Sequence, residues 1–266
     1  MTDIDLFKSE LYHLSIRLSA DGFSFSIYLP SAKENMFFST YSINTSYSMT
    51  ANIKEMIAGT AILGRSFEQV NILVDSPRYT LIPFDLYEDE QTDELFYQNF
   101  PKINNENILC NILGKSNVSI LFGIDKHAHQ FIYDQFPKAR IYSSISPLTE
   151  YFTLQSREHE GRQMYAHLTP HQMDIFAFDH DKLMLINSFS CKLLPDQVYY
   201  LLYVWKQLGF SQEKDTLYLA GKCTHKQALL VELHKFIRQI SVMESPLALQ
   251  TDQEIPFDIQ TLSICE

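Results

Sequence analysis

Apolar and polar residues alternate near the start of the chain, on both sides of a short turn. Residues 13–19 alternate with period two up to Ala20-Asp21-Gly22, and residues 23–30 continue the alternation beyond it. Alternation flanking an Asp-Gly pair is a strong local signal for a β-hairpin. The pattern therefore predicts a strand, a tight turn and a return strand between His13 and Pro30.

The remainder of the first half predicts further strands and two helices. Helical periodicity indicates a surface helix from about Ala51 to Leu63, with Gly64 as its C-terminal cap. A second helix is expected to begin at the capping residue Asp125, end at Phe136 and join a parallel strand pair. The acidic run 88–94 is either a solvated loop or the start of a helix. The other expected strands are 35–43, 69–75, 107–113, 117–124 and 139–145, with 107–124 as a second hairpin.

The first pattern restarts after the polar run 155–162. Strands are expected at 163–168, 173–178, 183–189 and 215–220, with one helix between Pro195 and Gly209. Thr224 and Gln227 form a capping box for a last helix that reaches Ile240, and the apolar tail 255–265 docks onto one of the domains. We therefore expect a first domain over 1–160, with an insertion around 77–117, and a second domain over 161–266.

Composition narrows the classes of function. The chain has 266 residues, 45% of them hydrophobic, and a formal net charge of −11. This charge disfavours nucleic acid and membrane surfaces as partners. The four cysteines are widely spaced, the N-terminus lacks the features of a signal peptide, and no apolar run is long enough for membrane insertion. We expect a cytoplasmic protein.

The order β-β-β-α-β occurs twice, which is typical of a duplicated ribonuclease-H-like fold of the actin and Hsp70 group. Three stretches, 14–25, 79–83 and 187–189, resemble a bacterial domain-of-unknown-function family, number 3822, whose members resemble actin-like ATPases. The resemblance implies an α/β protein with the duplicated ribonuclease-H-like (actin-like ATPase) fold, its two domains facing a central cleft. The resemblance extends over nearly the whole chain. Its motifs are hydrophobic and structural, so it supports a prediction of the fold more strongly than a prediction of the function.

The phosphate loops that this resemblance implies are degenerate. An actin-like ATPase uses Asp-x-Gly followed by a hydroxyl residue, so that magnesium, backbone amides and the hydroxyl together hold phosphate. If Gly22 is the glycine of this motif, Ala20 stands where the aspartate should be and Phe23 where the hydroxyl residue should be. If Asp21 is the aspartate, Phe23 replaces the glycine. The turn after Leu168 has no acid or glycine, and Pro170 removes an amide. The expected adenosine loop keeps only Gly221.

Other chemistries fit the sequence less well. The P-loop-like stretches 59–66 and 114–116 lack, respectively, the lysine and the first glycine of that motif. His127-x-His129 and His167-x3-His171 have ligand-like spacing but not a shared helical face. Asp21 and Asp125 are two possible carboxylates of a nuclease, although Asp125 also fits a helix cap. No serine elbow or activated cysteine is present.

We expect a catalytically silent module that acts as a scaffold or assembly factor through an unknown protein partner. The alternative is a divergent ATPase or small-molecule kinase that uses non-standard phosphate loops. No catalytic residue, metal or cofactor is expected, and ATP with magnesium applies only to the alternative. Oligomeric state is left open. The residues that would mark a vestigial nucleotide cleft are Ser19, Asp21, Gly22, Thr169, His171 and Gly221.

Overall fold

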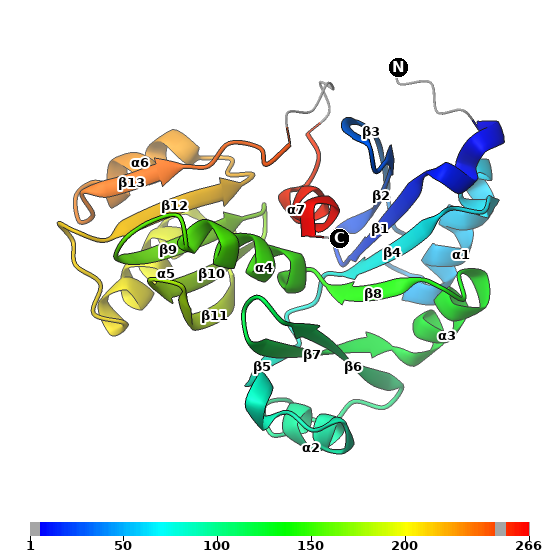
Figure 1. Ribbon diagram of the computed structural model, residues 1–266, viewed down its shortest axis with the longest axis horizontal. Helices are drawn as coiled ribbons and strands as arrows, with labels where there is room; N and C mark the ends of the chain where they lie inside the picture. The colour runs from blue at the N-terminus through cyan, green and yellow to red at the C-terminus, as the bar shows by residue number, and fades with distance from the viewer. Residues whose placement is uncertain (1–5, 248–253, 266) are drawn as a thin grey trace. The chain divides into compact units, whose positions relative to one another are not determined.

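The computed structural model describes residues 6–247 and 254–265. The chain divides into two compact units, Met1–Pro147 with Leu247–Glu266, and Leu148–Pro246. Figure 1 labels the helices and strands of each unit.

The first unit contains a five-stranded sheet in the order β3-β2-β1-β4-β8. Its strands are β1 (His13–Ser19), β2 (Gly22–Leu29), β3 (Ala32–Tyr41), β4 (Gln69–Val74) and β8 (Arg140–Ser143). β1 pairs antiparallel with β2, and the register places Leu18 opposite Phe23. The opening hairpin predicted from alternation is therefore confirmed. On its other side β1 pairs with β4 in parallel.

Two helices, α1 (Met49–Gly59) and α3 (Lys126–Gln135), cover one face of this sheet (Figure 1). The predicted cap of α3 is confirmed, since the Asp125 carboxylate accepts a hydrogen bond from the Ala128 amide at 2.8 Å. The predicted end of α1 is wrong. The helix stops at Gly59, because residues Ala61–Gly64 tighten into the 3-10 turn η2. The short 3-10 segment η1 (Leu6–Leu11) precedes β1.

The insertion forms a second, three-stranded sheet in the order β5-β7-β6. Its elements are β5 (Tyr79–Pro83), η3 (Phe84–Leu86), η4 (Asp89–Gln91), α2 (Thr92–Tyr97), β6 (Glu106–Leu113) and β7 (Val118–Asp125). The second predicted hairpin is confirmed as β6–β7. The predicted parallel pairing across α3 is wrong, because β5 and β6 occupy both edges of β7 and β8 pairs with β4 instead.

The C-terminal helix α7 (Phe257–Cys265) packs on the face of the large sheet away from α1 and α3 (Figure 1). Ile259 and Leu262 contact a cluster that contains Tyr28 and Leu73. Lys33 also donates a hydrogen bond from its ammonium group to the carbonyl oxygen of Ser263. The tail therefore belongs to the first unit, whereas the sequence pattern grouped it with the second domain.

The second unit repeats the strand order of the first, as β11-β10-β9-β12-β13. Its strands are β9 (Arg162–Leu168), β10 (Gln172–Asp179), β11 (Lys182–Ser190), β12 (Thr216–Gly221) and β13 (Gln239–Val242). As in the first unit, three antiparallel strands are followed by two parallel ones. This shared order confirms the predicted duplication.

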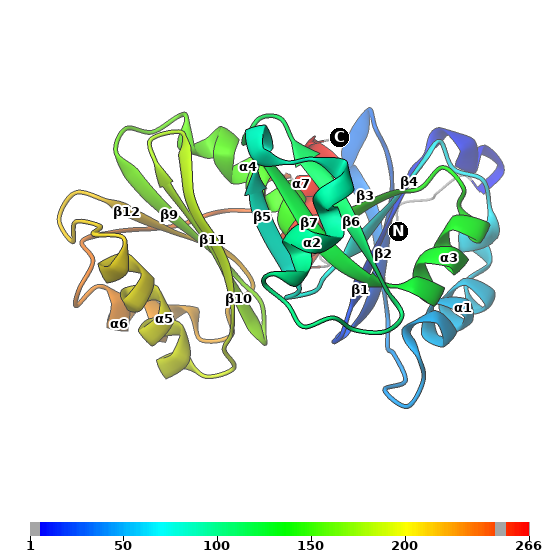
Figure 2. The ribbon, with the colours of Figure 1, turned by 90° about the horizontal axis from the view of Figure 1, so that it is seen from below.

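Helices cover both faces of the second sheet (Figure 2). Helices α5 (Leu194–Gln207) and α6 (Lys226–Leu233) bury Leu201, Trp205 and Leu233 against one face. On the other face, α4 (Ile145–Ser156) stacks Phe152 on Tyr165 at a ring distance of 4.8 Å. The division between the two compact units falls inside α4, at 147/148, rather than at the polar run that follows this helix.

Two sequence predictions for the second unit are wrong. Helix α6 has no side-chain cap, since His225 rather than Thr224 precedes it. It also ends at Leu233 instead of Ile240, because residues Gln239–Val242 form β13 and pair with β12. Phe236, which the longer predicted helix would have included, is 46% exposed.

Candidate functional site

The turn between β1 and β2 carries the three candidate residues of the first unit. Ser19 ends β1 and is buried, Asp21 is exposed in the turn, and Gly22 opens β2. Gly22 has a φ of +145°, which side-chain-bearing residues rarely adopt. The Ser19 hydroxyl accepts a hydrogen bond from the Asp21 amide at 3.3 Å. The hydroxyl therefore engages the hairpin's own backbone.

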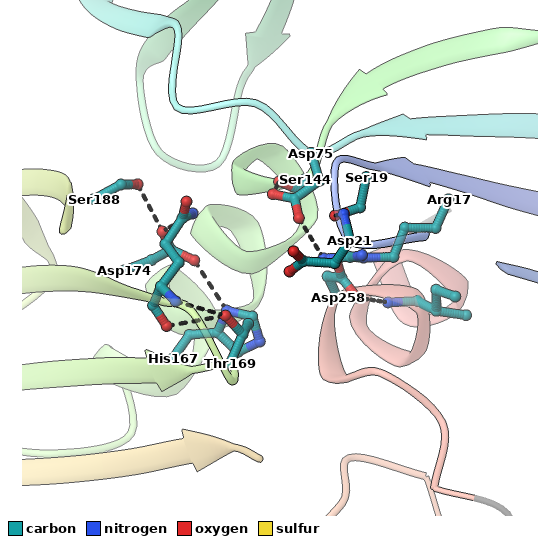
Figure 3. Close-up of polar contacts among 12 residues, drawn as sticks. Arg17, Ser19, Asp21, Asp75, Ser144, His167, Thr169, Asp174, Ser188 and Asp258 are labelled. Carbon is teal, nitrogen blue, oxygen red and sulfur yellow. Dashed lines mark hydrogen bonds and ion pairs between the residues drawn. The ribbon is translucent and has the colours of Figure 1, made fainter. Parts of the chain in front are cut away.

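An arginine that belongs to none of the sequence motifs links this turn region to the C-terminal helix. Arg17, on β1, places its Nη2 atom 2.5 Å from Asp75 and its Nε atom 2.6 Å from Asp258 (Figure 3). Asp75 follows β4 and also accepts a hydrogen bond from Ser144. Asp258 lies in α7 and its side chain is 1% exposed. One guanidinium thus bridges two carboxylates from distant parts of the first unit.

In the second unit, the β9–β10 turn forms hydrogen bonds within itself. The Thr169 amide donates to the Gln172 carbonyl at 2.9 Å, and the Gln172 amide donates to the Thr169 hydroxyl at 3.1 Å. Pro170 has no amide hydrogen. His171 is exposed, and its carbonyl accepts a hydrogen bond from Cys191. Three of the four turn positions therefore present no amide to a phosphate group.

A buried polar network lies on β9, β10 and β11 beside this turn. Nδ1 of His167 is 3.1 Å from Asp174, whose other carboxylate oxygen accepts hydrogen bonds from Ser188 and Gln172 (Figure 3). The side chains of His167 and Asp174 are 5% and 4% exposed. The Ser188 hydroxyl donates to the aspartate, whereas the serine of a serine hydrolase donates to the imidazole, so this arrangement differs from that relay.

Gly221 is fixed in place by its neighbours at the end of β12. Its φ is +79°, and a Cβ atom here would lie 2.5 Å from the Leu168 carbonyl oxygen and 2.9 Å from the His167 ring. Only glycine allows β12 to pass so close to β9 at this point. The structure thus brings Gly221 beside Leu168 and His167 within the second unit, and places Ser19, Asp21 and Gly22 together in the first.

The cysteine thiols of the second unit lack activation. Burial raises the pKa of Cys191 to about 11 and also raises the pKa of Cys223. Burial likewise raises the pKa of Cys110 in the insertion. All three thiols are therefore protonated near neutral pH, and a protonated thiol is a poor nucleophile and metal ligand.

One member of each histidine pair noted in the sequence bonds to another side chain, His129 to Asn107 and His167 to Asp174. His129 bonds to the Asn107 amide, and burial lowers the pKa of His129. Within residues 6–247 and 254–265, no cluster of three or more His, Cys, Asp or Glu side chains is arranged to hold a metal ion. Over the same residues, no helix is long and apolar enough to span a membrane.

Two of the candidate regions were predicted from the sequence, but the polar networks were not. The turns stand out locally because Asp-Gly and Thr-Pro signal turns. Arg17 and Asp258, by contrast, are 241 positions apart, so no local pattern indicates that they meet. The alternation that predicted β9 and β10 places His167 and Asp174 on neighbouring strands, and it gives the only local signal for their pairing.

Solved structures share this architecture. A Bacteroides thetaiotaomicron protein described as having an actin-like ATPase fold and unknown function is 45% identical, with a TM-score of 0.89 and 99% of each chain covered. A structure described as the PilM-PilN type IV pilus biogenesis complex has a TM-score of 0.59 at 10% identity, covering 96% of this chain and 97% of the other. The protein therefore has the actin-like ATPase fold.

No curated protein matches this chain. The family described as "Protein of unknown function (DUF3822)" matches residues 2–240, which is most of the chain. The protein therefore belongs to the DUF3822 family, and it shares the actin-like ATPase fold of the Bacteroides thetaiotaomicron protein.

Proposed function

We propose that this protein is a catalytically silent member of the actin-like ATPase fold that acts by binding another protein. The observation that supports the proposal most directly is the β9–β10 turn, whose polar groups form hydrogen bonds with one another. In an actin-like ATPase the corresponding turn directs its amides and a hydroxyl at phosphate. Here Thr169 and Gln172 bond to each other, and Pro170 has no amide hydrogen.

The first unit supports the same proposal. Phe23 and Ala20 occupy positions that phosphate binding assigns to a hydroxyl and an acid, and the Ser19 hydroxyl is engaged by its own turn. The Arg17 guanidinium, a natural partner for phosphate, is already bonded to Asp75 and Asp258. A phosphate that bound Arg17 through Nη2 or Nε would have to displace Asp75 or Asp258.

A protein-binding role has a precedent among proteins of this shape. PilM is described in a complex with PilN in type IV pilus biogenesis, so one structure with this fold associates with another protein. At 10% identity this likeness concerns the fold, and it supports the proposal by analogy alone.

Measurements of nucleotide binding and hydrolysis test whether the protein is catalytically silent. Thermal unfolding of the purified protein would be followed with millimolar ATP or ADP, with and without magnesium, beside an active actin-like ATPase as positive control. A ligand at about 100 times its Kd stabilises the folded state by roughly 2.7 kcal/mol, which raises Tm measurably. We expect no magnesium-dependent shift and no phosphate release above buffer.

Matched variants make the test specific. Asp21→Ala alters the β1–β2 turn, and Asp181→Ala alters the β10–β11 turn, where no phosphate loop is expected. Both variants should respond to nucleotide as the unmodified protein does. A saturable, magnesium-dependent shift that Asp21→Ala abolishes and Asp181→Ala preserves would refute the proposal.

A divergent ATPase or kinase is the second candidate, favoured by the two buried polar networks. Charged groups are costly to bury, and apolar residues often serve stability equally well. Arg17 with Asp75 and Asp258 in one unit, and His167 with Asp174 in the other, therefore suit a retained binding site. This candidate predicts that Asp75→Asn and Asp174→Asn weaken magnesium-dependent ATP binding, while Asp181→Asn does not.

A further inference from the structure

The three-stranded insertion carries exposed apolar side chains within a strongly acidic segment. Phe84 and Leu86, in η3, are 45% and 69% exposed. Ile112, on β6, is 55% exposed and lies on the same sheet face as Cys110, because side chains two apart on a strand share a face. Pro83 and Leu113 both pair with Val118 of β7, so η3, which begins at Phe84, lies at the end of the sheet that carries Ile112. We call Phe84, Leu86 and Ile112 the apolar patch.

The segment that carries Phe84 and Leu86 is rich in carboxylates that form no ion pair in the described part of the chain. Between positions 84 and 101 the sequence has no lysine or arginine. The six acidic side chains of this stretch are all exposed, and no ion pair within the described part of the chain uses any of them. They are Asp85, Glu88, Asp89, Glu90, Asp93 and Glu94, and we call them the acidic rim.

The segment that carries the rim is held in a defined conformation. The Tyr87 hydroxyl lies 2.8 Å from the Thr92 hydroxyl, which donates a hydrogen bond to the Asp89 carbonyl. Beneath α2, Arg78 makes two 2.9 Å hydrogen bonds to Glu106 and contacts the rings of Phe96 and Phe100. A binding surface held in place before contact loses less entropy on association.

We propose that the apolar patch and the acidic rim bind a basic, amphipathic segment of a partner protein. Exposed apolar side chains edged by charge are typical of interaction sites. Lysine or arginine side chains of the partner would relieve the repulsion among the rim carboxylates, while its apolar side chains cover Leu86 and Ile112. This inference rests on the proposed protein-binding function and names the chemistry of the partner.

Charge complementarity selects this occupant over a second copy of the chain. The protein has a formal net charge of −11, so a second copy would bring further negative charge to the rim. Nucleic acid and anionic lipid are disfavoured for the same reason. A segment with alternating basic and apolar residues satisfies both the patch and the rim.

The test uses fluorescein-labelled synthetic peptides of leucine and lysine in an amphipathic helical pattern, with a glutamate-for-lysine peptide as control. Fluorescence anisotropy would measure Kd for the full-length protein at low salt. The patch variant is Leu86→Ser. The rim variant combines Asp89→Asn, Glu90→Gln, Asp93→Asn and Glu94→Gln. The matched control removes four exposed charges elsewhere, through Asp134→Asn, Glu158→Gln, Glu160→Gln and Asp181→Asn.

We expect about a tenfold rise in Kd for the rim variant, because four exposed ion pairs contribute about 0.3–0.5 kcal/mol each and 1.4 kcal/mol is tenfold. Leu86→Ser should weaken binding by a similar factor without changing its salt dependence. The control variant should change Kd less than twofold, and the glutamate peptide should not bind. Circular dichroism and hydrogen exchange of β7 would show that the insertion stays folded in each variant.

Three results would overturn the inference. One is equal weakening by the control and rim variants, which would indicate diffuse attraction to an acidic protein. Another is unchanged affinity in both the rim and Leu86→Ser variants. The third is a dimer in sedimentation that Leu86→Ser converts to a monomer, which would identify a second copy as the occupant. The peptide experiment contains no nucleotide. Its failure would therefore be distinguishable from a failure of the proposed catalytic silence, which the nucleotide experiments test separately.

Discussion

The close approach of β7 to the Glu106 side chain gives a sharp test of how the insertion is held together. A Cβ atom at Gly123 would lie 2.2 Å from Oε1 and 2.7 Å from Cδ of Glu106. The carboxylate fills this space while it bonds to Arg78 through two 2.9 Å hydrogen bonds, and hydrogen bonding to Glu106 raises the pKa of Arg78. We therefore expect Gly123→Ala to push Glu106 away from Arg78.

The expected magnitude follows from burial. Breaking a fully buried ion pair by displacing one partner costs about 3–5 kcal/mol. The side chains of Arg78 and Glu106 are 21% and 9% exposed, so solvent screening reduces the effect to about 2 kcal/mol. When Glu106 is already alanine the clash is absent. Gly123→Ala should then be neutral or stabilise the strand by about 0.5–1 kcal/mol, since glycine is unfavourable within strands.

Hydrogen–deuterium exchange of the β5, β6 and β7 amides is the assay, because it reports the opening free energy of the insertion separately from the rest of the protein. The double-mutant cycle of Gly123→Ala and Glu106→Ala should give a coupling of about 2–3 kcal/mol. Gly114→Ala, in the β6–β7 turn, is the matched control, since nothing lies within 4 Å of its added Cβ atom. An equal cost of Gly123→Ala in both backgrounds would refute the reasoning.

Three further predictions concern other parts of the structure. Asn111→Ala should lower the free energy of opening of β8 by about 1–3 kcal/mol, because the Asn111 side chain bonds to the Ile141 carbonyl and the Ser143 amide and its loss leaves both unpaired. Hydrogen exchange of the β8 amides measures this loss, and unaltered protection would contradict the prediction. Gly221→Ala should lower Tm by several degrees through its 2.5 Å clash with β9, whereas Gly64→Ala, which meets open space, should not. Hydrogen bonding to His180 and then Arg162 lowers the pKa of Asp179, so its contribution to stability is present above its unfolded value near 4 and lost as pH falls through the lower folded value. Carboxyl NMR should show this lowered pKa, and Arg162→Gln should raise it; no change on substitution would exclude the guanidinium as a cause.

The sequence alone determined the elements whose signals are local. Alternation with period two is a property of neighbouring residues, so the hairpins β1–β2, β6–β7 and β9–β10 followed from it directly. Asp125 likewise predicted the start of α3, since a cap bonds to an amide only three positions away. The repeated order of these elements was sufficient to predict the duplicated fold.

Strand partners were decided by the tertiary structure. β8 pairs with β4 because both edges of β7 are taken, and a sequence does not show which edges are taken. Residues Gln239–Val242 have an apolar pattern that also fits a helix, and the open edge of β12 makes them a strand. The pattern of a short apolar segment is compatible with either a helix or a strand, and the partner against which the segment is buried determines which one forms.

The candidate site shows the same division. The sequence by itself shows the composition of the two turns, and that composition indicates poor phosphate loops. The bonds of Thr169 with Gln172, and the bridge from Arg17 to Asp258, exist only once the chain has folded. Local chemistry therefore determined which elements form, whereas long-range packing decided which side chains meet, because contacts between distant residues depend on the whole path of the chain between them.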